Sequence, residues 1–129
     1  MKKLLYLFIG FFIVIAISCS KEEVMTMEQE QQVLNQKLAE IVSIANSSNC
    51  TDASLWEISP IGSKACGGPT GYIAYSNTIN EVEFLNLVAN YTEEQNQFNL
   101  KWGVLSDCSV PTMPIGVTCI DNQPVFIYQ

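Results

Sequence analysis

Residues 80–103 read NEVEFLNLVANYTEEQNQFNLKWG, and this stretch predicts a helix with one apolar face. Asn80 and Glu83 have the spacing of a capping box, in which side chains accept hydrogen bonds from backbone N–H groups at the helix start. Apolar side chains then recur at helical spacing at Phe84, Leu87, Val88, Tyr91 and Phe98. Gly103 follows this stripe and suits the end of the helix.

An earlier stretch, residues 26–45, predicts a second helix. Thr26 and Gln29 repeat the capping-box spacing. The apolar positions Leu34, Leu38, Ile41 and Ala45 follow at intervals of four, three and four, which is one helical face. Residues 46–49 are Asn and Ser, whose side chains compete for backbone hydrogen bonds, so the helix is expected to end there.

Three short runs rich in β-branched and aromatic residues predict strands. The first is Tyr72–Tyr75, and the others are residues 115–120 and 125–128. Asp121-Asn122-Gln123-Pro124 separates the last two and predicts a hairpin.

Residues 51–70 contain many Gly and Pro residues and are expected to form a cross-linked loop with Trp56 and Ile58 pointing inward. The predicted fold class is therefore α+β, with two helices packed on a small antiparallel sheet, a C-terminal hairpin and disulfide bonds.

Four cysteines, Cys50, Cys66, Cys108 and Cys119, lie in the region of these elements. An even number of cysteines in a small domain predicts two disulfides where the domain is exported to an oxidising compartment, which the first residues of the chain indicate. Three pairings are open, and adjacency in the chain favours Cys50–Cys66 with Cys108–Cys119. A Cys₄ zinc site is disfavoured, because zinc ligands come in close pairs and the chain has no histidine.

The first residues have the layout of a secretory signal: Lys2 and Lys3, an apolar block from Leu4 to Ile17, and a small residue, Ser18. The block is short for a membrane span, which favours cleavage over retention as an uncleaved anchor. Ala16-Ile17-Ser18-Cys19 resembles the lipobox of bacterial lipoproteins. That resemblance implies cleavage before Cys19 and acylation of its thiol, which would anchor the protein on a membrane.

The predicted organisation follows from this motif: residues 1–18 are a lipoprotein signal peptide, residues 19–26 are the lipidated cysteine and a tether, and residues 27–129 form one small α+β domain. Ser20-Lys21-Glu22-Glu23 resembles the acidic tract that follows the lipid cysteine in bacteroidete lipoproteins displayed on the outer face; a solvated tether is the alternative. We expect a cell-envelope protein, lipid-anchored in the outer membrane and either periplasmic or surface-exposed.

The amino-acid composition argues against some classes of partner and of catalytic mechanism. Without residues 1–18 the chain would carry 13 acidic residues against four lysines and no arginine, so nucleic acid is a poor partner. The absence of histidine removes Ser-His-Asp and Cys-His catalysis. No catalytic, cofactor or metal site is indicated, and no pair of the carboxylates stands out as an acid and base.

Four aromatic residues are the candidate ligand contacts: Trp56, Tyr72, Tyr75 and Trp102. Aromatic side chains dominate interfaces and form platforms for sugars and peptides. Core packing is the alternative for each of them, because a domain of this size has few large residues from which to build a core.

A longer pattern begins at Gly62-Ser63-Lys64-Ala65-Cys66-Gly67-Gly68-Pro69, continues through Tyr72 and Tyr75-Ser76, and ends with Asn99 and Ser106-Asp107-Cys108. It resembles a group of small secreted bacterial proteins with a G-x-K-x-C-G-G-P-x-x-Y-x-x-Y-S segment and a later S-D-C. The resemblance covers about residues 50–120. It implies a domain built around disulfides and no catalytic role.

The expected function is a non-enzymatic binding or interaction module, anchored to the membrane through Cys19 and recognising an envelope or extracellular protein or glycan. The alternatives are a small secreted enzyme inhibitor and a carboxylate-dependent hydrolase.

Overall fold

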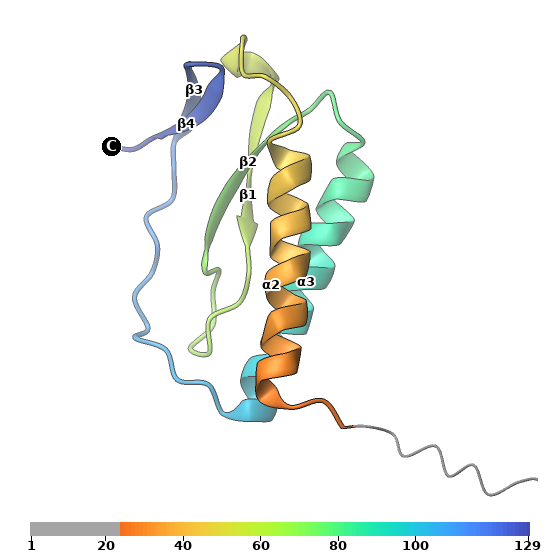
Figure 1. Ribbon diagram of the computed structural model, residues 1–129. Helices are drawn as coiled ribbons and strands as arrows, with labels where there is room; N and C mark the ends of the chain where they lie inside the picture. Colours follow the sequence, from red (N-terminus) through yellow and green to blue (C-terminus); the bar gives the residue numbers. More distant parts are fainter. Residues whose placement is uncertain (1–23) are drawn as a thin grey trace, which may run out of the picture.

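A computed structural model describes residues 24–129 and has the predicted α+β class (Figure 1). Its elements, in chain order, are α2 (Met27–Ala45), the 3-10 helix η1 (Ala53–Leu55), β1 (Trp56–Ile61), β2 (Gly71–Ser76), α3 (Glu81–Trp102), β3 (Gly116–Ile120) and β4 (Gln123–Ile127). The strands form two antiparallel two-stranded sheets, β1–β2 and β3–β4. Residues 1–23, with the predicted signal sequence and Cys19, lie outside the described residues.

Both helices begin and end where their capping residues predict. Thr26 Oγ1 accepts from the N–H of Gln29 at 3.3 Å, and Gln29 Oε1 accepts from the N–H of Thr26 at 2.8 Å, so the capping box of α2 is complete. Asn80 Oδ1 accepts from the N–H of Glu83 at the start of α3. Gly103 ends α3 with φ +60°, the left-handed conformation that glycine adopts without a steric cost.

The main core lies between the two helices and one face of the β1–β2 sheet (Figure 1). Its buried members are Leu34, Ile41, Ala45, Ile61, Tyr75, Phe84, Val88, Tyr91 and Phe98. Leu38 and Leu87, the other two predicted stripe residues, are partly buried against it. Neither α2 nor α3, the two long helices described between residues 24 and 129, is apolar enough along its length to cross a membrane.

The prediction of a loop over residues 51–70 is wrong in its first half, because residues 56–61 form β1. Pro60 obscures the strand pattern, since proline cannot donate to a ladder. It is tolerated because it stands opposite Tyr72, in a pair without backbone hydrogen bonds. The N–H of Asn77 donates to Leu55 O at 2.8 Å, so these two residues form a hydrogen-bonded pair. Bonded and non-bonded pairs alternate along an antiparallel ladder, which makes Pro60 and Tyr72 a non-bonded pair.

The C-terminal hairpin is confirmed, but its turn is shorter than predicted. Asp121 and Asn122 have φ values of +50° and +62°, which Asp and Asn tolerate and which a two-residue hairpin turn requires. Gln123 and Pro124 are therefore already in β4, opposite Ile120 and Cys119.

The predicted disulfide pairing is wrong. The bonds are Cys50–Cys119 and Cys66–Cys108, with Cα atoms 5.2 and 5.4 Å apart. Adjacency in the chain favours local bridges, but the fold returns the hairpin to the end of α2, where the N–H of Cys50 donates to Asn122 O at 2.9 Å. The first bridge therefore fixes the hairpin to the chain that follows α2.

Candidate functional site

The four aromatic candidates lie in different environments. Trp56 and Tyr75 are buried, with 7% and 4% of their surfaces exposed, so neither is available to a ligand in this conformation. Trp102 is half-buried at the end of α3. Tyr72 is half-buried and lines two surface hollows.

Tyr75 and Trp102 have clear structural roles. The Tyr75 hydroxyl donates to Glu81 Oε1 at 2.8 Å, and its ring lies 4.8 Å from that of Phe84. Burial, followed by the bond to Glu81, raises the pKa of Tyr75 to about 12. The Trp102 ring N–H donates to Glu30 Oε2 at 2.8 Å and so joins α3 to α2.

The two hollows beside Tyr72 form the candidate site, which we call the Tyr72 groove. The larger has a volume of about 530 Å³ and is lined by Gly71, Tyr72, Pro111, Thr112, Phe126, Tyr128 and Gln129. The smaller, of about 180 Å³, is lined by Val42, Ala45, Asn46, Tyr72, Ile73, Ala74, Pro124 and Phe126. Tyr72 and Phe126 line both hollows. No charged side chain lines either of them.

Two aromatic residues of this groove were missed by the sequence reasoning. Phe126 and Tyr128 follow one another on one side of β4 and its extension, with ring centroids 6.2 Å apart in an edge-to-face arrangement. The strand predicted at residues 125–128 already contained the signal, because residues two apart in a strand share a face. The sequence does not indicate that they will lie beside Tyr72, because this requires the hairpin to fold back against the β1–β2 sheet, where β3 contacts β1.

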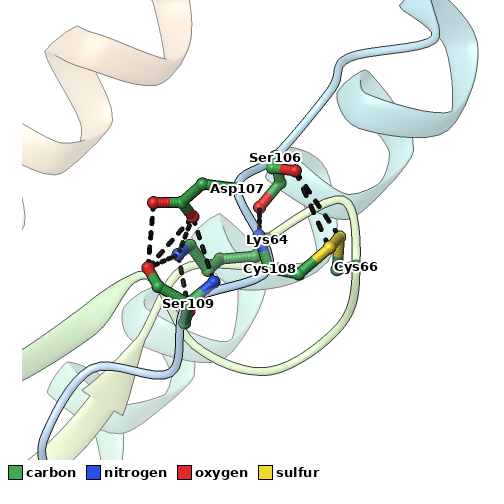
Figure 2. The surroundings of a disulfide bond; sticks show 6 residues. All are labelled: Lys64, Cys66, Ser106, Asp107, Cys108 and Ser109. Atoms are coloured by element: carbon green, nitrogen blue, oxygen red, sulfur yellow. Dashed lines mark hydrogen bonds and ion pairs between the residues drawn. A yellow bond between two sulfur atoms is a disulfide. The ribbon is translucent and has the colours of Figure 1, made fainter.

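One wall of the groove, at Pro111 and Thr112, belongs to the coil of residues 104–115 that joins α3 to β3. This coil is held at one point by Lys64 (Figure 2). Lys64 Nζ lies 2.7 Å from Asp107 Oδ1 and donates to the carbonyl oxygen of Ser109 at 2.7 Å. The Cys66–Cys108 disulfide lies beside these contacts, so a covalent bond and an ion pair fix the same segment.

The loop that carries Lys64 is itself bound to α3. Thr92 Oγ1 accepts from the N–H of Gly62 at 3.0 Å, and Gln95 Oε1 accepts from the N–H of Ser63 at 2.7 Å. Asn99, which is buried, donates from Nδ2 to Ser63 O at 2.8 Å. These three α3 residues lie on one helical face and together position the start of the loop.

The long sequence pattern thus gains a structural explanation. Its residues Lys64, Cys66, Ser106, Asp107 and Cys108 come from two segments and meet around the second disulfide (Figure 2). Gly62 and Asn99 form hydrogen bonds at the start of the loop that carries Lys64. Lys64, then Ser109, lower the pKa of Asp107 to about 2, so this carboxylate stays ionised in its pair. These residues position the coil rather than present a reactive group.

In the described domain every lysine is ion-paired, whereas most carboxylates are not. All three lysines between residues 24 and 129 pair with carboxylates, in Lys37–Glu94, Lys64–Asp107 and Lys101–Glu30. Among the glutamates of α3, Glu81 accepts from Tyr75 and Glu94 pairs with Lys37. The remaining acids leave the surface of this domain negatively charged.

A third hollow, of about 340 Å³, lies between α2 and α3 and contains three carboxylates, Glu30, Glu93 and Glu94. Glu30 and Glu94 are ion-paired, and Glu93 accepts from Gln97. Hydrogen bonds from Lys101 and Trp102 lower the pKa of Glu30. A general acid needs the opposite shift, so Glu30 is poorly suited to that role.

Comparison with known proteins gives no relative for this chain: no family model, no curated protein and no solved structure matches it. Within residues 24–129, no three His, Cys, Asp or Glu side chains are grouped so that they could hold a metal ion.

Proposed function

We propose that this chain is a lipid-anchored protein of the cell envelope that binds an uncharged ligand in the Tyr72 groove without catalysing a reaction. The observation that carries the binding role is the pair of hollows without charged side chains that share Tyr72 and Phe126 in their linings. Concave sites lined by aromatic side chains and a few polar groups are typical of ligand recognition. The anchor is proposed from Cys19 and the signal-like residues before it.

Two disulfides and an ion pair restrain the walls of the groove, which favours binding. The coil that carries Pro111 and Thr112 is tied to Lys64 and Cys66, and the hairpin that carries Phe126 is tied to Cys50. Walls that are ordered before binding cost less conformational entropy when the ligand arrives. The two disulfides therefore support the site as well as the fold.

The test of binding uses the full-length protein in detergent, screened against arrays of neutral oligosaccharides and of random peptides. We expect a ligand whose affinity falls at least about tenfold in Tyr72→Ala and in Phe126→Ala, because each removes an aromatic contact from both hollows. Val82→Ala, a change of a residue 73% exposed on α3, is the control and should leave affinity unchanged. Ligand binding that is indifferent to both groove variants would contradict the site.

The anchor is tested separately in cells. Mass spectrometry of the protein from its native envelope should find an acylated Cys19 as the first residue, and Cys19→Ser should release the protein from membranes. An intact Met1 together with an unmodified thiol at Cys19 would exclude the anchor.

Inhibition of a basic enzyme is the second candidate, favoured by the surplus of carboxylates and by the pairing of every described lysine. Such binding would weaken steeply with salt, because exposed charges are screened. Inhibition of a lysozyme at low salt, unaffected by Tyr72→Ala, would support this candidate over the Tyr72 groove.

A further inference from the structure

Strand β2 has one free edge. It belongs to a two-stranded sheet and pairs with β1 alone. Asn77 N–H donates to Leu55 O, and every second residue pair along the ladder from this one is hydrogen-bonded. The backbone N–H and C=O groups of Tyr75 and Ile73 therefore face β1. Those of Tyr72 and Ala74 must then face the opposite way.

The outward backbone groups of Tyr72 and Ala74 have no partner among residues 24–129, whereas Ser76 O, at the end of β2, accepts from the N–H of Ile79. None of the hydrogen bonds between described elements uses the backbone N–H or C=O of Tyr72 or Ala74. Unpaired strand edges are templates for another strand, and proteins usually block them with charge, proline or a covering element. Gly71, Tyr72, Ile73 and Ala74 contain none of these blocking residues.

The free edge also coincides with the Tyr72 groove. Gly71 and Tyr72 line the larger hollow, and Tyr72, Ile73 and Ala74 line the smaller one. Across from β2 stand the coil at Pro111 in one hollow and the end of α2 at Val42 in the other. The two hollows therefore lie at successive residues of the strand, the larger at Gly71 and Tyr72 and the smaller at Tyr72, Ile73 and Ala74.

From this coincidence we propose that the ligand of the groove is an extended peptide that adds a strand to the free edge of β2; this rests on the proposed function and names its ligand class. Added strands gain affinity from main-chain hydrogen bonds and specificity from pockets that take alternate side chains. The N–H and C=O groups of Tyr72 and Ala74 would supply the bonds. The two uncharged hollows would take apolar or neutral side chains of the peptide.

The chemistry favours a peptide over a glycan because of the backbone groups. A sugar can stack on Tyr72 or Phe126, but it does not need a row of N–H and C=O groups at strand spacing. A peptide uses both the rings and the edge. Aromatic walls suit aliphatic and proline side chains, and the absence of charge in the lining disfavours acidic or basic residues at the inward positions.

The test follows individual amides in full-length, ¹⁵N-labelled protein in detergent, with a decapeptide selected from a random displayed library as the probe. Binding should slow hydrogen exchange at Tyr72 and Ala74 by about tenfold or more. The amides of Ile73 and Tyr75 are the internal control, since they already face β1 and should exchange slowly with or without peptide. Protection that appears only at other segments would overturn the proposal.

Two N-methylated versions of the same peptide provide the matched probe. One version carries methyl groups on the backbone nitrogens of its odd-numbered residues, and the other carries them on those of its even-numbered residues. One phase should lose affinity by about tenfold or more and the other should bind nearly as well, because only alternate N–H groups of an added strand face β2. Equal effects of the two phases would overturn strand addition.

The outcomes also separate this inference from the proposed function. A neutral oligosaccharide that binds and is lost in Tyr72→Ala, while no peptide is selected, overturns the added strand and leaves the groove as the binding site. Protection of Tyr72 and Ala74 that grows with protein concentration alone would identify a second copy as the occupant and would also overturn the peptide. Failure of every probe overturns both proposals.

Discussion

The ammonium group of Lys64 lies 2.7 Å from a carboxylate oxygen of Asp107, 43 residues further along the chain, and this pair stands beside the Cys66–Cys108 disulfide (Figure 2). The loop before β2 and the coil after α3 are thus joined twice at one place. Because the same coil continues to Pro111 and Thr112, this junction sets the position of one wall of the Tyr72 groove.

Acid should weaken this junction. The pKa of Asp107 is about 2 in the folded protein against an ordinary value of 3.8, so its stabilising effect is present above about pH 4 and is lost as the pH falls through 2. We expect Asp107→Asn to lower the urea midpoint at pH 6 in low salt, and the difference from the wild type to shrink as the pH falls from 4 to 2. A difference as large at pH 2 as at pH 6 would contradict the role of the ionised carboxylate.

The two disulfides should be reduced in a fixed order. Cys66 and Cys108 are exposed, whereas Cys50 has 2% of its surface exposed and Cys119 is half-buried. Loops of 42 and 69 residues imply similar stabilisation, about 4 kcal/mol each in the chain-entropy model, so access decides which bond is cleaved first. Alkylation and peptide mapping during mild phosphine treatment should find Cys66 and Cys108 labelled first. Simultaneous labelling of all four would show that global unfolding precedes reduction.

Gly62 should be far less replaceable than Gly68. Both have positive φ values, +77° and +82°, so alanine costs about 1–2 kcal/mol at either position from the backbone alone. At Gly62 a Cβ would also lie 2.1 Å from Thr70 Oγ1 and 2.6 Å from Gln95 Oε1, while at Gly68 it meets nothing within 4 Å. We expect Gly62→Ala to lower the free energy of unfolding by about 3 kcal/mol or more in urea titrations. Equal losses in the two variants would show that the loop can move aside freely.

Alkaline pH should destabilise the folded protein by ionising Tyr75. Its pKa is about 12 in the folded protein and 10.0 ordinarily, so its contribution is present below pH 10 and is lost as the pH rises through 12. Tyr75→Phe removes the bond to Glu81 and should cost about 1 kcal/mol at pH 7. The difference from the wild type should shrink above pH 10, because the variant has no hydroxyl at this position to ionise. Tyr128→Phe, at a side chain 50% exposed, is the control and should show no such trend.

The helices were predictable because their signals are local. The pairs Thr26–Gln29 and Asn80–Glu83 mark helix starts within four residues, and the apolar stripes need only helical periodicity. The hairpin was predictable for the same reason. Strand β1 was not, since Pro60 breaks the pattern and its acceptance depends on the phase of pairing with β2.

The disulfide pairing and the groove depend on distant segments. Cys50 can bond to Cys119 only when β3 and β4 have folded back toward the end of α2. The same arrangement brings Phe126 to the hollow that Tyr72 also lines. The sequence identified Tyr72 as a candidate by its residue type, along with three residues that the structure places elsewhere. Nothing in the local sequence around Phe126 or Pro111 indicates which other segment they will approach.

The smaller disulfide ring, Cys66–Cys108, is enclosed within the larger one, Cys50–Cys119. A protease that cuts the chain once anywhere between Cys50 and Cys119 therefore leaves two pieces that remain covalently linked. The coil around Leu105 and Val110, which are 94% and 83% exposed, is an accessible place for such a cut. A nicked molecule would keep its mass on a non-reducing gel and separate into fragments only after reduction.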